Sequence, residues 1–462
     1  MAEVSAADLD VVISTDAGVV TCLMAQNRIQ VMAKRRTPPR KHTILTQADL
    51  AAQHRNLPKT RHGHSFAPDR VPPGFHTIVD PDKLPLQPWR DLPPAPGLPP
   101  YRMSLDTILD PDTVTSIKNS GKLVFHSVGD TGGVNTPTYI EGVSRFMECD
   151  MAYSKPPDRP SFFYHLGDVV YYDGESANYW PEFYEPYLNY HAPIVAIPGN
   201  HDGDVNPATG ESSLQAFARN FCAQSAVISP DNRDAPRRTM TQPNVFWTLN
   251  TPLVTIIGMY SNCPEGGQVS DTQRSWFISE LKAADPSLPV ILAVHHPIYS
   301  AYGPHPGSTR LKNLLEHCCE TADRAPDIVL TGHVHNYQRF SAPLHDKKSV
   351  PFIVAGAGGY NKRLHVLGKV FHEAQQKKKL PIQIHGEPEY LENFNDSQHG
   401  YLRVAVTKSK ITLDYIAVPD PSENAKDAFL KQYDTVEVAL QSQNSPTPAV
   451  RSKRTSRQRT HK

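Results

Sequence analysis

Short apolar runs alternate with longer amphipathic stretches from Lys122 onward. An apolar run too short for a helix of roughly ten residues is typical of a buried strand, and six such runs lie at Leu123–Val128, Phe162–Leu166, Ile194–Ile197, Val254–Met259, Val290–Val294 and Ile328–Leu330. The stretches between them predict helices at Tyr139–Met151, Tyr179–Tyr190, Asp271–Lys282 and Arg310–Thr321. Strands that alternate with helices indicate an α/β domain with a largely parallel sheet.

Three further apolar runs predict strands near the end of this region, at Phe352–Ala355, Leu402–Val406 and Ile411–Ala417. The short segment Lys408–Lys410 separates the last two predicted strands, so we expect them to form a hairpin.

Both ends of the chain lack this pattern. Eleven prolines lie between residues 68 and 100, and proline fixes φ and removes a backbone donor, so this segment is expected to run extended over the surface. Beyond Gln441 the chain is rich in Ser, Pro, Lys and Arg, which is typical of a solvated tail. We therefore predict a polar, Pro-rich N-terminal extension over 1–120, a main domain over 121–420, and a C-terminal extension over 421–462 that ends in a disordered basic tail.

Composition narrows the function classes only slightly. The 47 basic and 47 acidic residues balance, so no overall charge favours nucleic acid or a membrane surface. The six cysteines contain no CxxC pair, which argues against a zinc knuckle. The chain has no basic start followed by an apolar run and no apolar stretch of about 20 residues. We expect a cytoplasmic protein, with a secreted or periplasmic location left open.

Polar side chains follow five of the predicted strands directly, in most cases after a glycine. In open α/β sheets ligands bind beyond the carboxyl ends of the strands, so five such segments can meet in one place. Glycine at these turns lets the backbone pass close to a bound ion. The five segments are Ser127–Asp130, His165–Tyr171, Ile197–Asp202, Ala293–Pro297 and Leu330–His335.

These segments supply oxygen and nitrogen donors and no thiol, a set that suits zinc, manganese or iron. Seven donors exceed the four of a closed zinc site, but they suit two ions roughly 3.5–4 Å apart that share one carboxylate. Asp168 is the candidate bridge. A single Gly-Asp turn or histidine is usually structural, and it is the ordered occurrence of all five segments that favours a metal site. The predicted metal ligands are Asp130, Asp168, Tyr171, Asn200, His295, His333 and His335.

The order GD…GDxxY…GNHD…H…GHxH resembles the calcineurin-like metallophosphoesterases over about residues 121–420. Asp168 and Tyr171 are similar to the purple acid phosphatases in particular. This chain has Asp130-Thr-Gly where the wider family usually has Asp-x-His, and in purple acid phosphatases the tyrosine replaces that histidine. The stretch Gly332–Arg339 also resembles their last motif.

The resemblance implies an α/β fold of the metallophosphoesterase type, a four-layer α/β/β/α sandwich, and two metal ions. The first ion, Fe(III), would be bound by Asp130, Asp168, Tyr171 and His335. The second, Fe(II), Zn or Mn, would be bound by Asp168, Asn200, His295 and His333.

The implied activity is hydrolysis of phosphate monoesters, with a metal-activated hydroxide that attacks phosphorus in line. His201 follows Asn200 and is expected to contact phosphate and protonate the leaving group. His305, ten residues after His295, is a second candidate catalytic residue, with a loop position away from the substrate as the alternative. His296 is expected to point away from the metals. The sequence leaves open whether Asp202 and its neighbour Asp204 orient a histidine or face solvent.

Two other functions share these residues. A phosphodiesterase of the same superfamily would be expected to keep the Asp-x-His opening, and a non-catalytic metal-binding scaffold would be expected to lose ligands, whereas all seven are present. We expect a small phosphorylated substrate, no membrane partner, and no nucleic-acid partner despite the basic tail. The loops over 203–243 and 360–400 would determine which ester is cleaved.

Overall fold

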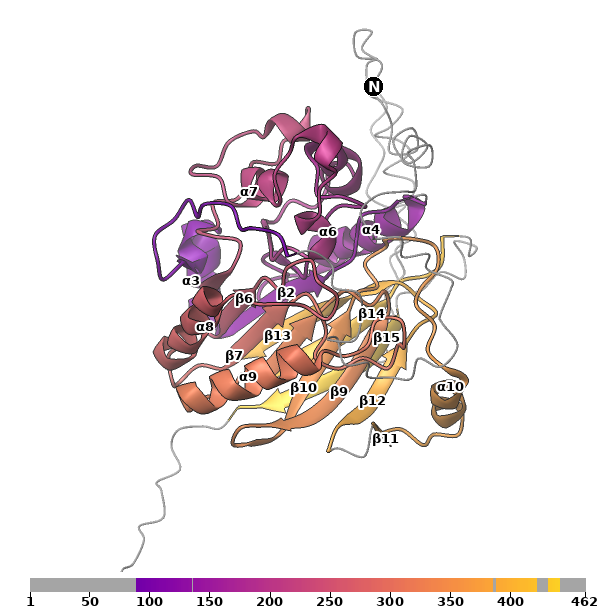
Figure 1. The fold of residues 1–462 in the computed structure, drawn as a ribbon. Helices are drawn as coiled ribbons and strands as arrows, with labels where there is room; N and C mark the ends of the chain where they lie inside the picture. The colour runs from indigo at the N-terminus through magenta and orange to yellow at the C-terminus, as the bar shows by residue number, and fades with distance from the viewer. Residues whose placement is uncertain (1–88, 135, 385–387, 422–430, 441–462) are drawn as a thin grey trace, which may run out of the picture.

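The structure is a computed structural model, which describes residues 89–134, 136–384, 388–421 and 431–440 (Figure 1). Most of the predicted N-terminal arm and the predicted basic tail beyond Gln441 lie outside these residues. Within the described residues, no helix is both long and apolar enough to cross a membrane.

Two β-sheets form the centre of the protein. The smaller sheet has the strand order β15-β14-β13-β2-β3-β4, with β2 at Lys122–Val128, β3 at Phe163–His165, β4 at Ile194–Ala196, β13 at Gly400–Thr407, β14 at Lys410–Ala417 and β15 at Lys431–Ala439. Strands β2, β3 and β4 are parallel. The predicted hairpin of β13 and β14 is present.

The larger sheet has nine strands in the order β1-β5-β6-β7-β8-β10-β9-β12-β11. Its central strands β6, β7, β8 and β10 are parallel, whereas β5, β9, β11 and β12 run antiparallel to a neighbour. The strands are β1 at Arg102–Ser104, β5 at Trp247–Asn250, β6 at Thr255–Met259, β7 at Val290–Val294, β8 at Ile328–Thr331, β9 at Tyr337–Leu344, β10 at Lys347–Ala355, β11 at Ile382–Gln383 and β12 at Tyr390–Asn395.

The two faces of each central strand enter different cores. Phe125 of β2, Ile291 of β7 and Leu402 of β13 belong to an apolar core between the sheets. Alternate residues on the central strands, such as Val128 and Leu292, face the other way and pack with the helices. This alternation is why the central strands are apolar throughout rather than at every second residue.

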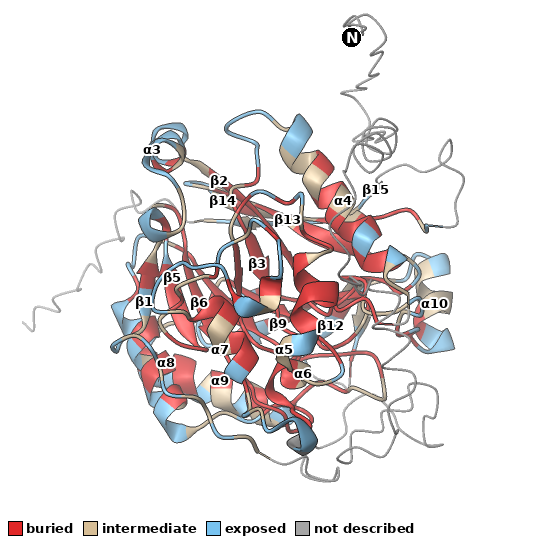
Figure 2. Cartoon of the chain, turned by 90° about the horizontal axis from the view of Figure 1, so that it is seen from above, coloured by how far each residue is buried: buried red, intermediate tan, exposed pale blue. Residues whose placement is uncertain are grey.

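Helices cover the outer faces of both sheets. Figure 1 shows α8 (Asp271–Ala283) and α9 (Thr309–Ala322) side by side against the larger sheet, and α4 (Thr138–Tyr153) packs on the smaller one. In Figure 2 exposed residues lie on the outer helices, such as α8, and the strands inside are largely buried. The predicted four-layer α/β/β/α sandwich is therefore confirmed. The other α-helices in the described residues are α3 (Pro111–Ser120), α5 (Ser176–Tyr179), α6 (Asn200–Gly203), α7 (Gln215–Phe221) and α10 (Lys369–Gln376).

The helix predicted at Tyr179–Tyr190 is not a continuous α-helix in the structure. The region 179–190 contains only the end of α5 and a π-helical turn over Trp180–Tyr184, followed by turns. Proline at 181 has no N–H to donate, and the N–H of Glu185 bonds to the carbonyl of Trp180, five residues back. The tyrosines at 184, 187 and 190 are buried, so their three-residue spacing reflects packing rather than a continuous helix.

The sheets also include strands outside residues 121–420, the range predicted for the main domain. Strand β1 (Arg102–Ser104) pairs with β5, and β15 (Lys431–Ala439) pairs with β14.

The strand register aligns the ends of the parallel strands, and with them the polar segments that carry the predicted metal ligands. Val128 of β2 pairs with His165 of β3, and His165 pairs with Ala196 of β4. In the other sheet, Ala293 of β7 pairs with Leu330 of β8. The segments that follow these strands therefore leave the two sheets at the same end of the sandwich.

Candidate metal centre

The structure brings all seven predicted metal ligands together in two groups that share one carboxylate. The first group surrounds the Tyr171 hydroxyl, which lies 3.0 Å from Asp168 Oδ2, 3.3 Å from Asp130 Oδ1 and 3.4 Å from His335 Nε2. His335 Nε2 also lies 3.5 Å from Asp130 Oδ1. These four side chains are the ones that the resemblance assigns to a first metal ion.

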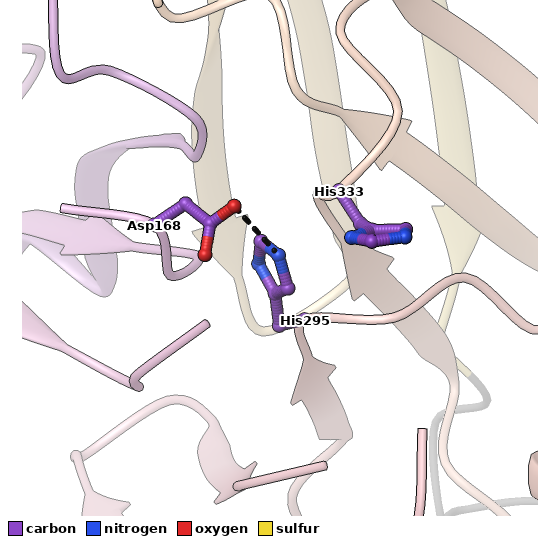
Figure 3. A group of neighbouring side chains, drawn as sticks. All are labelled: Asp168, His295 and His333. Carbon is purple, nitrogen blue, oxygen red and sulfur yellow. Dashed lines mark ion pairs between the residues drawn. The ribbon is translucent and has the colours of Figure 1, made fainter. Parts of the chain in front are cut away.

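The second group surrounds the side-chain oxygen of Asn200. Asn200 Oδ1 lies 2.9 Å from His333 Nδ1 and 3.2 Å from His295 Nε2, and His295 Nε2 lies 3.3 Å from Asp168 Oδ2. Figure 3 shows Asp168, His295 and His333 turned toward a common space, with the Asp168–His295 ion pair drawn as a dashed line. Asp168 Oδ2 therefore takes part in both groups.

The donor atoms have the spacing that a metal ion requires. A zinc-like ion binds oxygen and nitrogen at about 2.0–2.2 Å, so two ligand atoms on one ion lie roughly 3–3.5 Å apart. The distances within both groups fall in or close to this range. The donor set thus fits two ions, with Asp168 as the shared ligand.

The charge of the site also favours cations. Asp130 is fully buried and Asp168 is 1% exposed, and within the described part of the chain neither carboxylate pairs with a lysine or arginine. Burial raises the pKa of Asp130 well above its usual value, and the neighbouring Asp168 carboxylate adds to the rise. Burial alone would lower the pKa of His295, but the Asp168 carboxylate raises it to about 9. Bound cations would replace these protons as the compensating charge.

The backbone at the strand ends is shaped around the site. Asp130, Asp168 and His333 adopt φ values of 57°, 52° and 67°, a left-handed conformation that costs energy for residues other than glycine and that is often found at functional sites. A Cβ on Gly199 would lie 2.0 Å from Asp168 Oδ1. Only glycine allows the segment after β4 to pass so close to the shared carboxylate.

Hydrogen bonds fix the orientation of His295. Its Nδ1 lies 2.8 Å from the carbonyl oxygen of Leu166, and because a carbonyl only accepts, Nδ1 carries the proton and the lone pair of Nε2 faces the site. His335 is held differently. Its ring stacks on the ring of His365 at 4.3 Å, and its buried Nδ1 has no hydrogen-bond partner within the described ranges.

Asp202 and Asp204 have structural partners. The Asp202 carboxylate accepts hydrogen bonds from the backbone N–H groups of Gly199 and Val169, at 2.8 and 3.0 Å, and so ties together the turns that carry Asn200 and Asp168. Asp204 pairs with Arg90 at 2.7 Å. Neither carboxylate orients a histidine by a hydrogen bond among the described residues.

The two candidate catalytic histidines lie on opposite sides of the ligands. His201 Nδ1 donates to the carbonyl oxygen of Tyr172 at 2.7 Å, and its ring lies 4.5 Å from the ring of Tyr171, beside the first group. The His305 ring lies 4.7 Å from that of His333, beside the second group. Both are only partly buried, unlike most of the ligands. His296 lies behind the second group, with its ring 4.3 Å from that of His333 and its Nδ1 2.8 Å from the hydroxyl of Ser261.

Three further residues at the site are not among those predicted from the sequence. Glu265 lies in the loop after β6, with Oε1 3.3 Å from both His305 Nδ1 and His333 Nε2. His365 stacks on His335, and Tyr360 packs on Tyr171 with ring centroids 4.2 Å apart. They lie in the loops after β6 and β10, several residues beyond the strand ends, so the rule that ligands gather at the ends of parallel strands does not single them out.

Comparison with known proteins agrees with this geometry. A sequence model of the calcineurin-like phosphoesterase family matches residues 127–337, a range that contains all seven predicted metal ligands. Probable purple acid phosphatase 20 from Arabidopsis thaliana is 33% identical over 177 residues, which cover 36% of this chain and 38% of the relative. Purple acid phosphatase 21 from the same plant is 24% identical over 179 residues, 37% of each chain. The chain thus spans less than two-fifths of the length of these relatives.

Among solved structures, purple acid phosphatase PPD1 from yellow lupin (Lupinus luteus) seeds aligns with a TM-score of 0.45 and 14% identity, covering 69% of this chain and 54% of that chain. The family match spans the five segments that carry the predicted metal ligands, from Ser127 to beyond His335. Residues 127–337 therefore match the calcineurin-like phosphoesterase family, and part of the chain is similar to purple acid phosphatases.

Proposed function

We propose that this protein is a metal-dependent hydrolase of small phosphate monoesters with a dinuclear metal centre. The observation that carries the proposal is the pair of donor groups that share Asp168 Oδ2. The similarity to purple acid phosphatases supports a phosphomonoester substrate, as does Asp130-Thr-Gly in place of Asp-x-His.

Two metal ions would supply Lewis acidity for the phosphate and lower the pKa of a water molecule toward neutrality. Asp130, Tyr171 and His335 would hold the first ion, Asn200, His295 and His333 the second, and Asp168 both. Tyrosinate favours a hard trivalent ion, so we propose Fe(III) at the first position and Fe(II), Zn or Mn at the second.

His201 is placed to move a proton at the edge of the site. Its Nδ1–H donates a hydrogen bond to the carbonyl oxygen of Tyr172. Nε2 is therefore the atom that would exchange a proton with the leaving-group oxygen. Because the ring is partly exposed, Nε2 could reach a substrate that enters from solvent. His305, on the other side of the ligands, would bind the phosphate oxygens.

The proposal is tested with the purified full-length chain. We expect two metal ions per chain by elemental analysis, and faster hydrolysis of p-nitrophenyl phosphate than of bis(p-nitrophenyl) phosphate. Asp168→Asn should lose both metals and activity, because the shared carboxylate loses its charge. Asp110→Asn is the matched control, since Asp110 is an exposed helix cap whose bond to the N–H of Thr113 asparagine can replace.

Each outcome is informative. Preference for the diester would replace the monoester proposal by a phosphodiesterase, and two bound metals without hydrolysis of either substrate would indicate a metal-binding scaffold. A chain that binds no metal and hydrolyses neither ester would contradict the proposed function altogether.

A further inference from the structure

Glu265 lies behind the second group of donors, outside the seven predicted ligands. It is in the loop that follows β6, and its side chain is 8% exposed. Its Oε1 atom lies 3.3 Å from His333 Nε2 and 3.3 Å from His305 Nδ1. One buried carboxylate oxygen therefore faces a predicted metal ligand and a predicted substrate-binding residue at once.

The two ring nitrogens of His333 face different partners. Nδ1 lies 2.9 Å from Asn200 Oδ1, inside the second group of donors, and Nε2 lies toward Glu265. A carboxylate accepts hydrogen bonds, so it favours the tautomer with the proton on Nε2. That tautomer leaves the Nδ1 lone pair facing the metal position, and the negative charge behind the ring makes this lone pair a stronger donor.

Ring packing alone would not hold His333 in the tautomer whose Nδ1 lone pair faces the metal position. His296 packs on one side of it at 4.3 Å and His305 meets it edge-on at 4.7 Å, which restricts its tilt. Neither contact determines which nitrogen carries the proton. Glu265 provides the directional contact.

We propose that Glu265 is a positioning residue that orients His333 as a ligand of the second metal and holds His305 at the edge of the same site. This inference rests on the proposed dinuclear centre. It assigns Glu265 to the second metal only, because no contact in the described structure joins its carboxylate to Asp130, Tyr171 or His335. Its loss should weaken the second metal position and leave the first one intact.

The test measures metal affinity rather than turnover. Metal-free protein is titrated with Zn²⁺ in competition with a chromophoric chelator, after the first position has been loaded with Fe(III). For Glu265→Gln we expect the dissociation constant of the second metal to rise roughly 10- to 100-fold, the usual effect of removing such a partner. The visible absorption of a Tyr171–Fe(III) pair should be retained, since that pair lies in the first group.

Two further variants separate positioning from general damage. Glu280→Gln changes a buried carboxylate of α8 that binds Arg102 and Thr248, away from the metal ligands, and should leave the affinity for both metals unchanged even if it lowers the melting temperature. His305→Ala should also keep the affinity for the second metal, because Glu265 still contacts His333.

Three results would overturn the inference. One is an unchanged affinity for the second metal in Glu265→Gln, and another is an equal loss of both metals, which would make Glu265 a general structural residue. The third is binding of three metals by the unmodified chain and two by Glu265→Gln, which would make Glu265, His305 and His333 ligands of a further ion. If the unmodified chain binds no metal, the proposed function fails, which is distinct from failure of this inference in a chain that binds two.

Discussion

Replacing Gly199 by alanine tests how closely the turn after β4 approaches the Asp168 carboxylate. The new Cβ would lie 2.0 Å from Asp168 Oδ1, 2.4 Å from the Asp168 backbone nitrogen and 2.7 Å from its Cγ. Two of these atoms belong to a buried carboxylate and one to the backbone, so none can move without displacing the shared ligand. Overpacking of this kind costs typically 1–3 kcal/mol. Because the φ of Gly199 is −95°, which alanine tolerates, the cost is steric.

Gly142→Ala is the matched control. Gly142 lies inside α4, where a Cβ would meet only Val418 Cγ1, at 3.9 Å. Alanine is favoured over glycine in a helix by about 1 kcal/mol, so this variant should be more stable than the unmodified chain. Urea unfolding of the metal-free proteins measures both effects, and elemental analysis gives the metal content. We expect Gly199→Ala to be less stable and to lose bound metal. A Gly199→Ala protein with unchanged stability and full metal content would refute the described approach of Gly199 to Asp168.

Three further predictions follow from other contacts. Tyr171→Phe should abolish the visible absorption of the iron-loaded protein while circular dichroism shows an intact fold, and a retained band would exclude Tyr171 as the ligand. Burial alone would raise the pKa of Asp150, but the hydrogen bond from His126 and the charges of His126 and Arg403 lower it to about 2. Asp150 should therefore contribute about 2 kcal/mol of stability above pH 4, and this contribution is lost as the pH falls toward 2. In urea unfolding, Asp150→Asn should lose less stability over that pH range than the unmodified chain. An identical dependence of stability on acid pH in the two proteins would argue against the ion pair. Asp202→Ala removes the acceptor for the N–H groups of Gly199 and Val169, so its melting temperature and metal affinity should both fall, whereas unchanged values would show that the two turns hold without it.

The elements predicted best from the sequence are strands that are buried on both faces of their sheet. The run Val290–Val294 coincides with β7 because each of its residues is buried. Strand β9, at Tyr337–Leu344, was missed because polar residues such as Gln338 and Arg339 interrupt its apolar pattern, although Gln338 is buried and donates to Asn336. Strand β15 alternates polar and apolar residues at the edge of its sheet. Half-polar strands depend on their neighbours, which a single sequence does not reveal.

The seven candidate metal ligands could be selected from the sequence because each follows a strand in a short segment with glycine or histidine neighbours. Glu265 and His365 could not be predicted in the same way, since they lie several residues beyond the ends of β6 and β10, in loops whose course depends on tertiary contacts. The positions of Asp202 and Asp204 were likewise undecided, because their partners Val169 and Arg90 are distant in the sequence.

The proposed dinuclear centre requires that Asp168 joins two metal positions. The most direct test is a crystal structure of the metal-loaded protein with anomalous scattering data collected at the absorption edges of iron and zinc. We predict two anomalous peaks roughly 3.5–4 Å apart, with the Asp168 carboxylate between them, Tyr171 next to one and Asn200 next to the other. A single peak, or two peaks that do not both contact Asp168, would contradict it.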